Sequence, residues 1–320
     1  MLRSLPTWPQ TACRLTSHDR GRMKLLLLGA DGQLGTELRR SLAPLGEVVV
    51  ATLGGTLGEA ACEIADFSRP DSLPPLVERI APDIVVNAAA HTAVDRAEQE
   101  PDLSFRINSE APGVLARACR QQEALLVHYS TDYVFDGRGT RPYRETDPPA
   151  PNSIYGASKR AGEQAVQASG CHHLIFRTAW VYAAHSNNFL RTMLRVGAER
   201  DELRVVADQI GTPTPAALIA GTTAQVLQQM PQASGLWHLT ASGQTSWHGF
   251  AEAIFAGALA RGLLAHAPRV TAIPTTDYPT PAARPAYSVL DCSALQREFG
   301  IVLPDWRAGL DRVLDELQGG

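Results

Sequence analysis

The chain has 320 residues, which suits one large or two interleaved domains with ample core. Its composition, with 44% hydrophobic and 19% charged residues, is typical of a soluble globular protein, and no apolar run approaches the roughly 18–20 residues that span a bilayer. The net charge of −4 provides no basic surface for nucleic acid or an anionic membrane, so neither is expected as a partner.

Residues 1–22 differ from the rest of the chain. They carry four arginines and two prolines, but neither apolar periodicity nor the apolar core of a signal peptide. We predict that they form a disordered extension, with Met23 as an alternative start. The five cysteines of the chain are scattered without a CxxC pair, which indicates free thiols and a cytoplasmic protein rather than disulfides or a zinc site.

A short apolar strand over residues 24–28 opens the predicted fold. It leads directly into the turn Gly29-Ala30-Asp31-Gly32-Gln33-Leu34-Gly35 and then into a helix pattern from Thr36 to Leu42. Strand, glycine turn and helix in this order are the setting of a dinucleotide-binding site, because glycines let the backbone approach a pyrophosphate at the helix N-terminus. The GxxGxxG spacing therefore predicts cofactor binding by Gly29, Gly32 and Gly35.

The second strand, over residues 48–51, ends without a carboxylate. Enzymes that use NAD place an acid on the adenosine ribose at this point, roughly 20 residues past the glycine turn. Thr52 and Leu53 stand there instead, so a 2′-phosphate would meet no repulsion. We therefore predict NADPH as the cofactor, with NADH as an alternative.

Strands and helices alternate through about residue 180. A strand at 84–87 ends in Ala88-Ala89-Ala90-His91-Thr92, a helix is predicted at 109–122, and a further strand follows at 124–127. Alanines at a strand end let a flat cofactor lie close to the backbone. This order predicts an α/β fold with a doubly wound parallel sheet.

The expected reaction centre follows that last strand. Ser130, Thr131, Asp132 and Tyr133 come where its carboxyl end should open, which is where open α/β sheets bind ligands. Tyr155 and Lys159 are four positions apart in a predicted helix, so both lie on one face. The chain contains no lysine besides Lys24 and Lys159, although it has 29 lysines and arginines together. We predict that Tyr155 donates a proton and that the Lys159 ammonium lowers its pKa.

The second half offers candidate substrate contacts in loops. A strand at 174–177 leads to Trp180, Asn188 precedes a helix that runs to Arg200, and a proline-rich loop at 279–285 carries Arg284. A polar turn lies at 208–214. Loops over the ligand end of a sheet typically hold the substrate.

Together these segments resemble the extended short-chain dehydrogenase/reductase superfamily and, within it, the dTDP-4-dehydrorhamnose reductases. The glycine turn and YxxxK are shared by the whole superfamily, whereas other segments are more specific. The resemblance covers roughly residues 23–317 and rests on GADGQLG, VVNAAAHTAVDRAE, VHYSTDYVFDG, YGASK, FRTAWVY, NNFLRTML, DQIGTPT, YPTPAARPAYS and LPDW.

The resemblance implies a Rossmann-type sheet with a smaller interleaved α/β substrate domain. Residues 23–180 would form the NAD(P)-binding domain, and residues 181–317 mainly the sugar-nucleotide domain, with segments returning to the first. The implied reaction is NAD(P)H-dependent reduction of the C4 ketone of dTDP-6-deoxy-L-lyxo-4-hexulose to dTDP-L-rhamnose, the last step of that biosynthetic route.

The resemblance also implies roles for individual residues. Tyr155 would protonate the developing alkoxide, Lys159 would lower its pKa and bond the nicotinamide ribose, and Thr131 would hydrogen-bond the ketone oxygen. Asp132 and Trp180 match sugar contacts, while Asn188 and Arg284 match positions near the nucleotide. The remaining cofactor-lining positions are Gly32, Gln33, Leu34, Asp66, Phe67, Ala90, His91, Thr92 and Tyr129.

One departure concerns a metal ion. Some members bind magnesium at a dimer interface through three glutamates per subunit, and Glu37 and Glu316 match two of them. Ala217 stands at the third position, so we expect no magnesium site of this kind, although the resemblance remains compatible with a homodimer.

Two alternatives to the reductase remain. Epimerases and dehydratases of the superfamily return the hydride within one turnover and keep their cofactor bound. The regulatory subunit of methionine adenosyltransferase also resembles this family and is a non-catalytic partner. The joint presence of Tyr155, Lys159 and Thr131 favours an enzyme.

Overall fold

The computed structural model describes residues 23–229 and 233–319. The extension predicted for residues 1–22 lies outside this range, and so does Cys13. Within the described residues, Cys62, Cys119, Cys171 and Cys292 are free thiols. No helix of the described chain has the length and apolar character needed to cross a membrane.

A parallel sheet of seven strands forms the centre of the molecule, in the order β13-β8-β7-β6-β1-β2-β5. Every neighbouring pair in this sheet is parallel. The predicted doubly wound parallel sheet is therefore confirmed. Its strands are β1 (Lys24–Leu28), β2 (Glu47–Thr52), β5 (Glu63–Ile64), β6 (Ile84–Asn87), β7 (Leu125–Thr131), β8 (His173–Thr178) and β13 (Gly235–His238).

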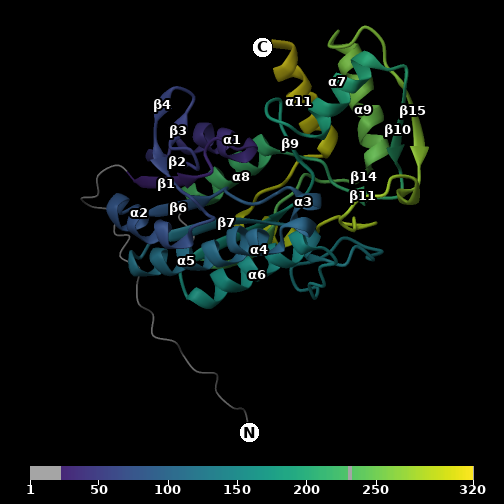
Figure 1. Cartoon of the computed structure of the whole chain (residues 1–320). Helices are drawn as coiled ribbons and strands as arrows, with labels where there is room; N and C mark the ends of the chain where they lie inside the picture. The colour runs from purple at the N-terminus through teal and green to yellow at the C-terminus, as the bar shows by residue number, and fades with distance from the viewer. Residues whose placement is uncertain (1–22, 230–232, 320) are drawn as a thin grey trace.

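Helices cover both faces of this sheet, as Figure 1 shows. Alternate residues of each strand point to opposite faces: Leu25 and Leu27 belong to one buried core, Leu26 and Leu28 to another. The first core lies under α1 (Gln33–Leu42), α8 (Ala216–Gln228) and α10 (Ser293–Phe299). The second lies under α2 (Leu73–Ile80), α5 (Ala111–Gln121) and α6 (Ile154–Ser169).

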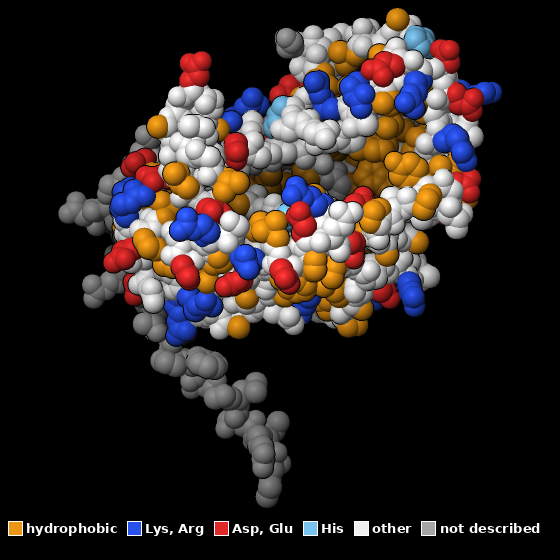
Figure 2. Space-filling view, viewed as in Figure 1, with side chains coloured by type: hydrophobic (Ala, Val, Ile, Leu, Met, Phe, Trp, Pro, Cys, Tyr) orange, Lys and Arg blue, Asp and Glu red, His pale blue; other side chains and the backbone are white. Residues whose placement is uncertain are grey.

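A separate core lies beside the sheet, at the upper right of Figure 1. It is built from α7 (Phe189–Glu199), α9 (Trp247–Ala260) and α11 (Trp306–Gly319), with the parallel pair β10 (Glu202–Val206) and β15 (Arg269–Ile273). Figure 2 shows the surface hollowed between this part and the body that contains the sheet. Four short strands lie between the two parts: β9 (Val181–Tyr182), β11 (Ile210–Gly211), β12 (Thr214–Pro215) and β14 (Thr245–Ser246).

Several helices and strands begin or end at other residues than predicted. The helix predicted at 36–42 begins at Gln33, and the strand predicted at 124–127 extends to Thr131. The helix predicted at 109–122 continues a longer helical stretch with a π-helical turn in it. The remaining elements are β3 (Thr56–Leu57), β4 (Ala60–Ala61), 3₁₀ turns at Pro70–Ser72, Asp132–Val134 and Thr275–Asp277, α3 (Val94–Gln99), α4 (Pro101–Phe105) and the π-helix Arg106–Glu110.

Candidate active site

The glycine turn joins β1 to α1 at the carboxyl edge of the sheet. The strand order reverses between β1 and β6, which is where doubly wound sheets open a ligand crevice. Gly29 has φ +75°, and a Cβ atom there would lie 2.8 Å from Ala89 N. A Cβ atom on Gly35 would collide with the Gly29 carbonyl oxygen. No side chain caps the N-terminus of α1, so its backbone N–H groups can receive an anion such as a pyrophosphate.

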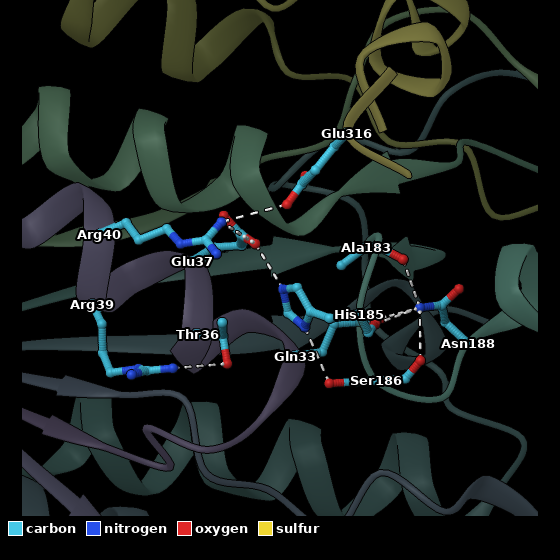
Figure 3. A network of polar contacts seen from close by, with 10 residues as sticks. All are labelled: Gln33, Thr36, Glu37, Arg39, Arg40, Ala183, His185, Ser186, Asn188 and Glu316. Atoms are coloured by element: carbon cyan, nitrogen blue, oxygen red, sulfur yellow. Dashed lines mark hydrogen bonds and ion pairs between the residues drawn. The ribbon is translucent and has the colours of Figure 1, made fainter. Parts of the chain in front are cut away.

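Gln33 and Asn188 join this turn to the start of α7, as Figure 3 shows. Asn188 Nδ2 donates to Gln33 Oε1 at 2.8 Å and to the Ala183 carbonyl at 2.9 Å, while its Oδ1 caps α7 at Arg191 N. Gln33 Nε2 donates to the Val181 carbonyl at 3.1 Å. Both side chains therefore bond protein groups here and link the cofactor turn to α7, while the nucleotide contact of Asn188 stays a prediction.

The other predicted cofactor positions line the neighbouring strand ends. Leu34 packs against the first core, and Phe67 is buried in the second. Asp66 Oδ1 accepts from Ser68 N and Oγ, at 2.9 and 2.6 Å. Ala90 and Thr92 lie in the irregular segment after β6, and Thr92 is exposed.

A residue that the sequence analysis did not single out, Asn108, holds the segment after β6. Its Oδ1 accepts from His91 N at 2.9 Å, and its Nδ2 donates to the His91 carbonyl at 3.0 Å and to Ser158 Oγ at 3.1 Å. The side chain is 1% exposed and lies on the π-helix Arg106–Glu110. Such π turns occur frequently at functional sites, but no periodicity in the sequence marks them.

Thr131, Tyr155 and Lys159 come together at the end of β7. Thr131 is the last residue of that strand, and Ser153 caps α6 through Gly156 N, which places Tyr155 in the first turn of the helix. Lys159 is 3% exposed, and its Nζ donates to the Tyr129 carbonyl at 2.7 Å. The Tyr129 hydroxyl pairs with Thr223 Oγ1 at 2.8 Å on the other side of the sheet.

The pKa values of Tyr155 and Lys159 are both shifted. Burial raises the pKa of the Tyr155 phenol to about 12, against which its contact with the Thr131 hydroxyl acts. Burial lowers the pKa of Lys159 to about 8, while Glu163 raises it. The net shift is upward because burial of the phenol dominates it, so the lowering by Lys159 stays a prediction.

A buried ion pair between Glu163 and Arg177 lies next to Lys159. Glu163 lies one helical turn further along α6 and accepts from Arg177 Nε and Nη2, both at 2.7 Å. Burial alone would raise the pKa of Glu163, but the bidentate contact with Arg177 holds it below the ordinary value. Glu163 thus remains ionised beside the ammonium.

The predicted sugar contacts lie nearby. Asp132 is 2% exposed and directly follows Thr131. Trp180 stacks on Trp247 with ring centroids 3.5 Å apart and an interplanar angle of 5°. Its φ of 47° is rare outside glycine, and such strain is found mostly at functional sites. Arg284 is anchored by Asp95 Oδ2 at 2.7 Å and lies near the Tyr133 phenol.

At the two glutamates considered for magnesium, the structure places an arginine. Arg40 Nη1 lies 3.7 Å from Glu37 Oε1 and 3.5 Å from Glu316 Oε1, and His185 Nε2 contacts Glu37 Oε1 at 2.7 Å (Figure 3). Ala217 is exposed at the start of α8. In the described part of the chain, no three His, Cys, Asp or Glu residues are grouped so as to hold a metal ion.

The fold is that of Rossmann-type reductases and epimerases. A UDP-glucose 4-epimerase from Thermus thermophilus in complex with NAD shares the fold, with 21% identity, a TM-score of 0.74 and coverage of 93% of this chain and 100% of that one. The family model described as RmlD substrate binding domain matches residues 23–319. The chain belongs to the dTDP-4-dehydrorhamnose reductase family, as its resemblance predicted.

Individual relatives support this assignment. The dTDP-4-dehydrorhamnose reductase of Burkholderia thailandensis is 51% identical over 296 residues, covering 89% of this chain and 96% of the relative. That of Escherichia coli is 47% identical over 298 residues, covering 92% and 98%. The solved structure from Bacillus anthracis, in complex with NADP, is 35% identical with a TM-score of 0.85 and covers 92% of this chain and 100% of that one.

Proposed function

We propose that the chain is an NADPH-dependent dTDP-4-dehydrorhamnose reductase, which reduces the C4 ketone of dTDP-6-deoxy-L-lyxo-4-hexulose to dTDP-L-rhamnose. The observation that carries the proposal is the meeting of Thr131, Tyr155 and Lys159 at the end of β7, in a chain of this family. An acid and a hydrogen-bond donor at one point are what a ketone oxygen needs as it gains negative charge.

Tyr155, Thr131 and Lys159 each have a different role at the oxygen atom on C4. Tyr155 is protonated at neutral pH, because its pKa is raised to about 12, and it donates its proton to the developing alkoxide. Thr131 hydrogen-bonds the same oxygen, and Lys159 stabilises the phenolate that forms. Asp132 and Trp180 contact the sugar, and Arg284, held by Asp95, lies toward the nucleotide.

The uncapped N-terminus of α1 and the glycines of the turn would hold the cofactor pyrophosphate. Gly32, Gln33 and Leu34 would contribute backbone groups, and Asp66, Phe67, Ala90, His91, Thr92 and Tyr129 would line the same crevice. When bound, NADPH supplies the hydride. The absence of a carboxylate at Thr52 and Leu53 favours NADPH over NADH.

We also propose the following organisation. Residues 23–180 form mainly the cofactor domain and residues 181–317 mainly the sugar-nucleotide domain, with β13 returning to the central sheet. The protein acts in the cytoplasm, where dTDP-sugar substrates are made, and it is compatible with a homodimer. Magnesium is not required, because Arg40 occupies the position between Glu37 and Glu316.

A spectrophotometric assay tests the activity. NADPH and dTDP-6-deoxy-L-lyxo-4-hexulose are mixed with the protein, and NADPH oxidation is compared with dTDP-L-rhamnose formation. Stoichiometric consumption supports the reductase, whereas conversion of a sugar nucleotide without net NADPH loss indicates an epimerase or dehydratase. No turnover of either kind indicates a binding subunit. Tyr155→Phe is the matched control, since it removes the proton and keeps the ring.

A further inference from the structure

The hydroxyl proton of Thr131 is already in use in this structure. Thr131 Oγ1 donates to Asp132 Oδ1 at 3.0 Å and accepts from Tyr133 N at 3.2 Å. A threonine hydroxyl has one proton and two lone pairs. While Asp132 is a carboxylate that accepts this proton, Thr131 has none to offer to a ketone oxygen.

Asp132 lies where a carboxyl group can hold a proton of its own. It is 2% exposed, and its Oδ2 atom has no hydrogen-bond partner among the described residues. Burial raises its pKa to about 6, against which the neighbouring hydroxyls of Ser288 and Thr131 act. The Ser288 hydroxyl is itself buried without a partner of good geometry in the described chain.

The groups around Asp132 supply little charge. The phenols of Tyr133 and Tyr155 face it from the 3₁₀ turn and from α6, and both are neutral because their own pKa values are raised. Ser288 faces it from the segment that follows the proline-rich loop. Arg284 and Asp95 form an ion pair and act on the adjacent Tyr133 with opposite signs, and the Lys159 ammonium is held at the Tyr129 carbonyl. Removal of water by a bound substrate would therefore favour the protonated carboxyl further.

We propose that Asp132 is a positioning residue that must carry a proton before Thr131 can donate its hydrogen bond to the substrate oxygen. The proposal rests on the proposed function. The protonated carboxyl donates to Thr131 Oγ1, so the hydrogen bond between the two residues reverses. Thr131 then accepts from Asp132 and from Tyr133 N, and its own proton turns to the oxygen on C4. The proton on Asp132 stays there throughout, and Tyr155 remains the acid.

The raised pKa of Asp132 determines how kcat/KM should change with pH. The protonated fraction of Asp132 falls as the pH rises through its pKa of about 6. At saturating NADPH, kcat/KM should therefore decline as the pH rises above about 6, by at most roughly tenfold per pH unit. Because the substrate excludes water, the same decline in kcat should lie at higher pH than the decline in kcat/KM.

Asp132→Asn tests the proposal. The amide cannot ionise and can donate to Thr131 at every pH, so the decline should disappear. We expect wild-type kcat/KM to fall by about tenfold or more between about pH 6 and about pH 8, and the variant to stay within about twofold over the same range. The readout is the slope, because loss of a sugar contact would change kcat/KM at all pH values alike. A variant that keeps the wild-type decline overturns the proposal.

Ser288→Ala provides an independent measurement if Asp132→Asn does not fold, as judged by melting temperature and NADPH binding. Removing this hydroxyl should raise the pKa of Asp132 and move the decline upward by up to about one pH unit. A decline that does not move, or a wild-type profile that is flat in this range, contradicts the proposal. A wild-type protein without stoichiometric NADPH oxidation would instead remove the proposed function itself. Thr131→Val should be slow at every pH.

Discussion

The central sheet and the part built on α7, α9 and α11 position their side chains by different means. β7 and β8 are paired over six consecutive residues, through to Thr131 and Thr178, so hydrogen-bonded backbone fixes the reaction centre. β9 and β12 pair over two residues, and so do β11 and β14. The second part has the β10–β15 pair, over five residues, but the short strands that join it to the sheet depend on side-chain packing to hold their shape. We therefore expect single substitutions in the sheet to affect chemistry and those in the second part to affect substrate binding.

Aromatic rings provide that packing. Trp247 stacks on Trp180 and also contacts Phe189, with ring centroids 4.7 Å apart. Phe250 joins Phe189 to Trp306. The backbone of Gly211 lies so close to the Trp180 indole that a Cβ atom there would overlap the ring. The left-handed backbone at Trp180 is thus maintained by contacts from β11 and α9.

The largest effect is expected at Lys159, inside the sheet region. Lys159→Arg keeps the charge, but the longer planar guanidinium cannot occupy the place of an ammonium that is 3% exposed and donates to the Tyr129 carbonyl. We expect kcat to fall by about a hundredfold or more. Lys24→Arg is the matched control, because Lys24 Nζ, at the first residue of β1, makes a single hydrogen bond among the described residues, to the Ile80 carbonyl at 3.3 Å. Equal activities of the two variants would contradict the role of Lys159.

The glycine turn should show the next largest effect. A Cβ atom in Gly35→Ala would meet the backbone carbonyl of Gly29, which no side-chain rotation can relieve. We expect NADPH affinity to fall by roughly tenfold or more, with about 1–3 kcal/mol less stability. Gly221→Ala lies in α8 with nothing within 4 Å of its Cβ position and should be neutral or slightly stabilising. Calorimetric titration with NADPH measures both, and unchanged affinity in Gly35→Ala would show that the turn is not the pyrophosphate site.

The two regions also differ in how far the sequence predicted them. Five strands of the sheet, β1, β2, β6, β7 and β8, are apolar runs followed by a glycine, alanine or polar residue, and they were predicted from the sequence, whereas β5 and β13 were not. The second core draws on residues between Tyr182 and Leu314, far apart in the chain. The two-residue strands that join it to the sheet exist only because of tertiary pairing, which no local pattern encodes. Helix starts were misplaced for a similar reason, as at Gln33.

In the site, side-chain types indicated the chemistry, but the direction of each hydrogen bond could not be predicted. Asn188 carries a polar amide at a suitable position, yet its donors bond Gln33 and backbone carbonyls. Asn108 carries the same group and organises the segment at His91, but the π-helix that aims it has no sequence signature. The pKa of Tyr155 depends on burial, which the Tyr–Lys spacing does not reveal.

A substitution at Trp247 tests whether the second region affects substrate binding. Trp247→Ala removes the ring that stacks on Trp180, an interaction worth about 0.5–1.5 kcal/mol. We expect KM for the keto-sugar nucleotide to rise by roughly two- to tenfold while the affinity for NADPH stays unchanged. Trp237→Ala is the counterpart in the sheet: it should lower the melting temperature, because Trp237 packs against Phe176 and Phe299, but leave KM alone. A higher KM in Trp237→Ala than in Trp247→Ala would break the proposed division between the regions.

The smallest effect concerns cofactor choice at the end of β2. Thr52 is 1% exposed, and its hydroxyl donates to the Thr56 carbonyl at 3.1 Å, so it serves the β3–β4 hairpin rather than a ribose. Leu53, 68% exposed, is the position from which a carboxylate could reach the adenosine end. We expect wild-type kcat/KM with NADPH to equal or exceed that with NADH, and Leu53→Asp to shift the ratio toward NADH by up to about tenfold. Thr52→Val should leave the ratio within about twofold, because the hydroxyl it removes faces the hairpin. Strong preference of the wild type for NADH would mean that the ribose is recognised elsewhere, and the turn at Asp66, whose Oδ1 already orders Ser68, would be the next position to substitute.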